Sequence, residues 1–224
     1  MADNTYHVMV TCPQCGRKSD YAMETLIDAT MDPKAEEKVF SGSLFTHVCP
    51  FCKEEETLTY SCLYHDGARN VLIGFADSDK DLTDFRTALN KGNHRDELDN
   101  VLNDWLARCR VRLVTSMMDL QEKVLIFHFD LDDRLVEIAK HYAKIVAEEK
   151  QPDLVIDKLM LNRNEDDYAF VVFNEDGIAG EIPFSKETYN MLKQRYETAL
   201  TGEKSIEIDE KWAEAFLLKK EMRA

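Results

Sequence analysis

Two short stretches, TCPQCG at residues 11–16 and VCPFC at residues 48–52, decide what the first part of this chain is. Each holds two cysteines separated by two residues, a gap that lets a tight turn direct both thiolates at one ion. Gly16 supplies the positive φ that such turns often need. Together the stretches predict a closed four-thiolate shell around one structural zinc ion. The predicted ligands are Cys12, Cys15, Cys49 and Cys52.

Other uses of these cysteines fit the pattern less well. A catalytic zinc keeps an open coordination position, and four thiolates leave none. Iron in a rubredoxin-like site uses the same ligands, so the identity of the metal stays open at this stage. We expect Cys62 and Cys109 to be small buried core residues. His47 and His65 lie near the second cysteine pair and could replace or support a ligand.

The composition of the 224 residues, 44% hydrophobic and 32% charged, is that of an ordinary folded protein. No stretch approaches the ~20 consecutive apolar residues of a membrane-spanning helix. The first residues, MADNTYHVMV, lack the basic segment and apolar run of a secretory signal. We therefore expect a cytoplasmic protein without a membrane partner, in a compartment where thiols stay reduced.

The charge of the chain argues against general nucleic-acid binding. There are 28 basic and 43 acidic residues, and residues 1–66 alone hold 5 basic and 11 acidic side chains, net −6. Phosphate binding rests on Lys and Arg, so nucleic acid is an unexpected partner and a basic protein a more natural one. A nucleic-acid-binding ribbon is the alternative. It needs a basic patch, for which Arg108, Arg110 and Arg112, expected on one face of a strand, are the candidates.

Hydrophobic alternation predicts strands at residues 18–30, 43–48, 57–64 and 70–76. The last two should form a hairpin around a His65-Asp66-Gly67 turn. Between the cysteine pairs, Asp32 as N-cap and Pro33 as first helical residue open a short helix that ends near Phe40. Residues 1–78 are thus expected to be a β-rich zinc ribbon with a helical insert.

The remaining residues, 79–224, are predicted to form an α+β part with an antiparallel sheet and several helices. The sheet has strands at 154–161, 168–173 and 178–184, and a further strand lies at 111–115. Helices are predicted after the capping residues Ser116, Asp132, Ser185 and Asp209. An apolar stripe from Leu98 to Cys109 indicates one more helix. Without a long linker, the two parts should pack closely, in an overall α+β fold.

No phosphate-binding loop, dinucleotide signature or nucleophile elbow occurs in the sequence. The first interpretation is therefore a non-enzymatic protein that uses its zinc ribbon as a protein–protein interaction or adaptor module. An enzyme is the alternative from another class. Its site would lie in the C-terminal part or around His65 and Asp66, because loop residues often carry function.

The two CPxC stretches also resemble the CpXC family of prokaryotic proteins. The segments that carry the resemblance are residues 11–16 and 48–52, Asp32-Pro33, and the stretches GSLF at 42–45, LYHD at 63–66, EKVLIF at 122–127 and LDDR at 131–134. The resemblance covers residues 8–140. It implies a zinc-ribbon-like module with the four cysteines as metal positions. It implies no activity, because the family is functionally uncharacterised.

Overall fold

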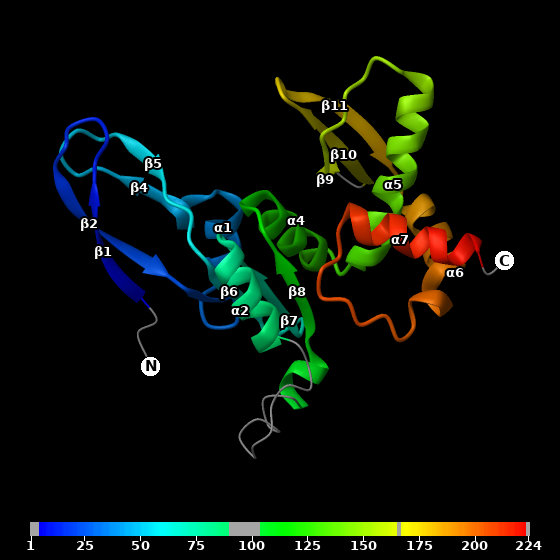
Figure 1. The fold of residues 1–224 in the computed structure, drawn as a ribbon, viewed down its shortest axis with the longest axis horizontal. Coiled ribbons are helices and arrows are strands. Elements are labelled where there is room, and N and C mark those ends of the chain that lie inside the picture. The colour runs from blue at the N-terminus through cyan, green and yellow to red at the C-terminus, as the bar shows by residue number, and fades with distance from the viewer. Residues whose placement is uncertain (1–4, 90–103, 165–166, 223–224) are drawn as a thin grey trace. The chain divides into compact units, whose positions relative to one another are not determined.

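The computed structural model describes residues 5–89, 104–164 and 167–222, in two compact units, Met1–Val124 and Leu125–Ala224 (Figure 1). Helices and strands are mixed in both units, so the expected α+β class is confirmed. The division after Val124 differs from the boundary expected at residue 78. The reason is β8 (Arg110–Val114), which pairs in parallel with β7 (Val71–Phe75) and so belongs to the sheet of the first unit.

The first unit begins with two antiparallel hairpins. One consists of β1 (Thr5–Thr11) and β2 (Lys18–Glu24), the other of β4 (Thr46–Val48) and β5 (Glu55–Thr57). We call these four strands and their two turns, residues 5–24 and 46–57, the ribbon arm. Figure 1 shows both turns at the same end of the arm. Each turn contains one of the cysteine pairs, so the pairing of the strands brings both pairs together.

A four-stranded sheet follows the ribbon arm, in the order β3-β6-β7-β8. It contains β3 (Leu26–Asp28) and β6 (Cys62–Asp66), which run parallel, while β6 and β7 are antiparallel. All five residues of β7 are buried, as expected for a central strand with helices on the sheet. The helices of this unit include α2 (Asp79–Leu89) and the first part of α4 (Met117–His128), which crosses into the second unit after Val124.

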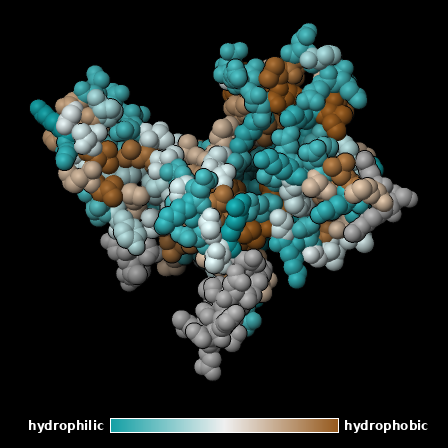
Figure 2. Space-filling model, in the orientation of Figure 1, coloured by the Kyte–Doolittle hydropathy of each residue, from teal (hydrophilic) through white to brown (hydrophobic). Residues whose placement is uncertain are grey.

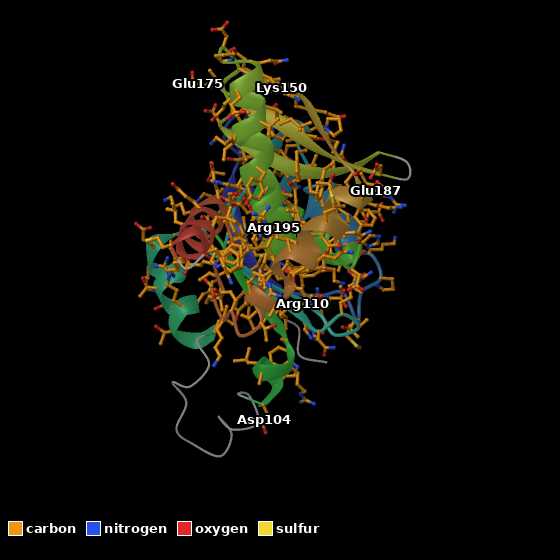
Figure 3. All side chains as sticks on the ribbon, turned by 90° about the vertical axis from the view of Figure 1, so that its right-hand side faces the viewer. Asp104, Arg110, Lys150, Glu175, Glu187 and Arg195 are labelled. Carbon is orange, nitrogen blue, oxygen red and sulfur yellow. The ribbon has the colours of Figure 1, made fainter. Side chains whose placement is uncertain are left out.

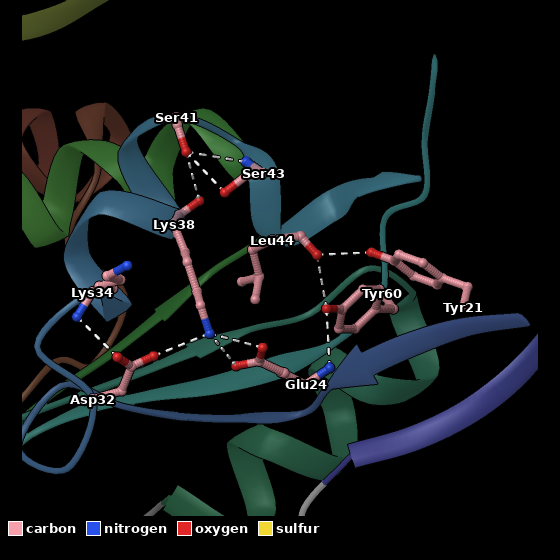
Figure 4. Close-up of polar contacts among 9 residues, drawn as sticks. All are labelled: Tyr21, Glu24, Asp32, Lys34, Lys38, Ser41, Ser43, Leu44 and Tyr60. Atoms are coloured by element: carbon pink, nitrogen blue, oxygen red, sulfur yellow. Dashed lines mark hydrogen bonds and ion pairs between the residues drawn. The ribbon is translucent and has the colours of Figure 1, made fainter. Parts of the chain in front are cut away.

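The helical insert between the cysteine pairs is α1 (Ala35–Phe40), and it begins later than predicted. Asp32 was expected as the N-cap, but Lys34 takes that position. The Asp32 carboxylate instead accepts a hydrogen bond of 2.9 Å from the Lys34 amide and pairs with Lys38 (Figure 4). The Asp-Pro pair therefore builds a turn that precedes the helix. Lys38 also bonds to Glu24 and so links α1 to the end of β2.

Several predicted strands are shorter in the structure, because they bend where the chain crosses from the arm to the sheet. Residues 18–30 divide into β2 and β3, and residues 43–48 begin as a 3₁₀ turn, η1 (Ser43–Phe45). In the predicted strand 57–64, residues 58–61 are irregular. There Tyr60 and Tyr21 both donate to the carbonyl of Leu44, at 3.1 and 2.7 Å (Figure 4). These two hydrogen bonds join β2 and the irregular residues 58–61 to the chain just before β4.

The second unit packs three helices and a three-stranded antiparallel sheet. Its strands β9 (Lys158–Asn164), β10 (Asp167–Asn174) and β11 (Gly177–Phe184) lie in the order β11-β10-β9. Its helices are α5 (Asp133–Lys150), α6 (Lys186–Leu200) and α7 (Glu210–Glu221). Figure 3 shows Lys150 and Glu175 at the end of this unit away from α7. The helical core consists of Leu135, Ile138, Tyr196, Leu200, Ala213, Phe216 and Leu217.

The helix caps predicted after residue 100 are confirmed, unlike that at Asp32. Asp132, Ser185 and Asp209 each accept a hydrogen bond from a backbone amide of the first helical turn. The Ser116 hydroxyl accepts a hydrogen bond of 3.1 Å from the Asp119 amide. The predicted stripe of residues 98–102 lies outside the described residues. Its continuation, residues 104–108, is helical, with Leu106 buried.

Candidate metal centre

The structure brings the four predicted ligands together at the end of the ribbon arm. Cys12 and Cys15 lie in the turn between β1 and β2, and Cys49 and Cys52 in the turn between β4 and β5. The Sγ atoms of Cys12 and Cys52 are 3.5 Å apart, and those of Cys15 and Cys49 3.7 Å. All four lie within 4.8 Å of one another. A tetrahedral zinc–thiolate shell requires about 3.8 Å between sulfurs, so this group could hold a metal ion.

The two cysteine turns have the same backbone geometry. In each, the amide of the residue after the second cysteine donates to the carbonyl of the first: Gly16 to Cys12 at 2.9 Å, and Lys53 to Cys49 at 3.0 Å. Both donors have a left-handed conformation, with φ of 69° at Gly16 and 66° at Lys53. That conformation costs a non-glycine residue about 1–2 kcal/mol. The positive φ of Gly16 could be expected from the sequence, but that of Lys53 could not, because a lysine side chain gives no sign of it.

Backbone amides and neighbouring sulfurs shift the acidity of the second cysteine pair in opposite directions. The Cys52 amide donates to the Cys49 sulfur and, against the effect of burial, lowers the pKa of Cys49 to about 6. The Glu54 amide acts to lower the pKa of Cys52, but burial and the neighbouring cysteines outweigh it and raise that pKa to about 12. Cys49 and Cys52 therefore lose their protons together only if a cation balances their charge. A bound metal ion would supply that charge.

The site is closed by its own ligands. Cys12 and Cys49 are buried and Cys15 and Cys52 are exposed, so the arm encloses one side of the cluster. Four sulfurs complete a tetrahedral shell and leave no position for substrate or water. A metal held here would stabilise the two turns, and it would offer no coordination position for catalysis.

The remaining cysteines and the nearby histidines have other surroundings. Cys62 and Cys109 are buried, and burial raises the pKa of Cys62 to about 12. The Nε2 atom of the buried His47 lies 2.9 Å from the Ser19 hydroxyl, and its ring packs edge-on against Tyr21. His65 pairs with Asp28, with 3.4 Å between Nδ1 and Oδ2. Within the described part of the chain, the metal-ligand cluster contains the four cysteines without either histidine.

The structure changes the surroundings expected for His65 and Asp66. Both lie in β6, not in the turn after it, so their side chains point to opposite faces of the sheet. Asp66 is buried and forms an ion pair with Arg69. His65 contacts the ring of Trp105 instead, with centroids 5.4 Å apart. The two residues therefore do not form the joint site on which the alternative of an enzyme at this position depended.

The expected row of arginines is also different in the structure. Arg108 lies in the helical residues 104–108, where its side chain donates to the carbonyl of Asp104. Arg110 and Arg112 lie in β8, and Arg112 is buried with a hydrogen bond of 2.7 Å to the Val111 carbonyl. The expectation that these three residues share one strand face is therefore wrong.

Comparison with known proteins gives one match. The family described as "CpXC protein" matches residues 10–140, more than half of the chain. No curated protein and no solved structure matches. Among the described residues, no helix has both the length and the apolar character required to cross a membrane. The matched residues include both cysteine turns and the whole four-stranded sheet, and the chain belongs to the CpXC family.

Proposed function

We propose that the four cysteines hold one zinc ion with a structural role. Soft thiolates in a tetrahedral arrangement select zinc or iron, and the sulfur spacing supports such an arrangement. Of the two, zinc fits a closed site with a structural role, because zinc has no redox chemistry.

Protein purified without chelators is expected to contain close to one zinc ion per chain, because the described residues form a single four-cysteine group. Elemental analysis of the purified protein measures both the metal and its stoichiometry. Iron as the main metal, or a metal-free protein, would contradict the assignment of zinc.

We propose further that the ribbon arm binds another protein, through the surface beside the metal centre. The observation that carries this proposal is a contact between the two cysteine turns. Phe51 lies in the second turn with 51% of its surface exposed, and the guanidinium of Arg17 sits 5.0 Å from the centre of its ring. Aromatic and arginine side chains are the residues most enriched at the energetic centres of protein interfaces. A structural metal would hold both of them in place.

The surroundings of this pair support a protein as the ligand. Val48, next to the second turn, is also exposed, and Figure 2 shows apolar side chains at the surface of the arm between hydrophilic ones. Acidic residues Glu54, Glu55 and Glu56 follow the turn. An apolar centre beside acidic groups suits a partner that offers apolar and basic side chains. This agrees with the net charge of −15 of the chain.

The test is affinity capture from a lysate of the native host with zinc-loaded protein. Wild type is compared with Phe51→Ser and with the control Ile178→Ser, which alters an even more exposed apolar residue in the second unit. We expect a protein that is retained by wild type and the control and reduced at least about tenfold by Phe51→Ser. Equal capture by all three proteins would mean that Phe51 is not part of the interface, and it would contradict the proposal.

A nucleic-acid ligand gives a different expected result. Residues 1–66, which include the arm, hold 5 basic and 11 acidic side chains and should be repelled by phosphates. We expect no detectable binding to duplex or single-stranded oligonucleotides near physiological salt in a gel-shift assay. Tight binding that weakens steeply as salt rises would contradict this expectation. The proposed ligand would then be a nucleic acid and not a protein.

A further inference from the structure

From Tyr6 to Thr11, strand β1 leaves one side of its backbone unpaired in the part of the chain that the structure describes. It pairs with β2 alone, in a two-stranded sheet. The N–H and C=O groups along the other edge of a strand are a template on which a further strand can add. The edge of β1 is therefore a surface whose natural ligand is an extended backbone.

Natural edge strands usually carry a protective feature, and β11, β3 and β8 are examples among the described residues. β11 has Glu181, Pro183 and a break in register opposite Val172 and Phe173. β3 is only three residues long, and β8 begins with Arg110. Charges, prolines, bulges and short length all oppose the addition of a further strand.

None of these features occurs in β1. Its sequence, TYHVMVT, has no lysine, arginine, carboxylate or proline, and its seven residues pair with β2 without a register shift. Tyr6 and Met9 are each 63% exposed and Val8 is 36% exposed, so apolar side chains lie on both faces of the strand. Valine, threonine and tyrosine favour strands, and β1 has five of them. The edge is thus open, regular and apolar.

The sequence of β1 is complementary to itself. In an antiparallel pair of two copies centred on Val8, that residue faces the partner's Val8, and Tyr6 faces the partner's Val10. His7 then faces the partner's Met9. Aromatic and β-branched residues form favourable cross-strand pairs. No pair brings like charges together, although each chain carries net −15, because β1 itself has no lysine, arginine or carboxylate.

We propose that β1 pairs with β1 of a second copy of this chain, antiparallel, about a two-fold axis that passes beside Val8. Such a contact is isologous and closes on itself, so it produces a dimer and cannot extend into a larger assembly. The two hairpins become one continuous four-stranded sheet in the order β2-β1-β1-β2. The inference goes beyond the proposed function, and it neither requires the Phe51 surface nor uses it. A dimer would present that surface twice to a partner.

The test uses the full, zinc-loaded chain and light scattering coupled to size exclusion. Wild type at about 100 µM is expected to show twice the chain mass of 25.9 kDa and to dissociate on dilution. Val8→Lys and Val8→Glu place like charges opposite each other across the axis. Each variant alone is expected to be monomeric, with dimer affinity reduced at least about tenfold. Mixing the two variants brings Lys opposite Glu and is expected to restore the dimer.

The matched controls are Ile178→Lys and Ile178→Glu, which place the same charges on the exposed edge strand of the second unit and should leave the dimer unchanged. A monomeric wild type, or a dimer that the Val8 variants do not affect, would overturn the proposal. So would a mixture of the variants that stays monomeric, because Val8 would then not face itself. If a Val8 variant fails to retain zinc, Tyr6→Lys, at a more exposed position, tests the same edge. Partner capture by Phe51 is measured separately, so either proposal can fail alone.

Discussion

Cys49→Ser is expected to lose the metal ion and to unfold the ribbon arm. Cys49 is buried, and its sulfur lies 3.7 Å from that of Cys15. In small zinc domains the binding energy of the metal, an apparent ~10–16 kcal/mol, is also the folding energy. The arm has short strands and few buried residues, so it has little else to stabilise it. Loss of a ligand should thus appear as loss of bound zinc by elemental analysis and as a loss of β-structure by circular dichroism.

Cys62→Ala is the matched control, because Cys62 is equally buried but lies in β6, outside the metal cluster. We expect it to retain its zinc and to lose only about 1–2 kcal/mol of unfolding free energy, the cost of a small change in a core. If both variants lost metal to the same extent, Cys62 would be part of the site, and the four-cysteine assignment would be incomplete.

Ile138→Ala should cost about 2–5 kcal/mol of unfolding free energy in the second unit. Ile138 lies on α5, is fully buried, and belongs to the core that α5 forms with α6 and α7. Truncation leaves a cavity that close-packed neighbours fill only in part. Chemical denaturation followed by circular dichroism measures the loss, and zinc content should be unchanged because all four ligands lie in the first unit.

The control for this substitution is Ile145→Ala on the same helix. Ile145 is substantially exposed, so its truncation should change stability by no more than about 0.5 kcal/mol. Similar losses for Ile138→Ala and Ile145→Ala would mean that the helical core is not packed as described. The pair compares the same chemical change at a buried and an exposed position of one helix.

The cysteine cluster and most of the helix starts could be predicted because each depends on a few neighbouring residues. A gap of two residues between cysteines constrains a turn by itself, and two such turns in one chain suggest a common ion. The caps at Asp132, Ser185 and Asp209 likewise act on amides two or three residues away. Short-range geometry of this kind is readable without knowledge of the rest of the fold.

Features that depend on distant parts of the chain could not be read in this way. The hydrophobic pattern of β8 predicts a strand but not the strand beside it, so the parallel pairing with β7 and the division of the chain after Val124 were missed. Lys53 adopts a left-handed conformation because its turn repeats that of Gly16, not because of its own preference. The position of Asp66 depends on where β6 ends, and strand ends are set by pairing partners.

The separation of the cysteines into two environments determines where oxidants act on this protein. Peroxide and other electrophiles must reach a sulfur atom to react with it, and Cys62 is buried, with only 1% of its surface exposed. Cys15 and Cys52 are exposed, and Cys52 has the sulfur of Cys12 at 3.5 Å. Oxidation therefore begins in the arm, where it would release the metal and join neighbouring sulfurs while Cys62 in the sheet stays reduced. Chemical stress would then disable the end of the arm first and leave the sheet beside it intact.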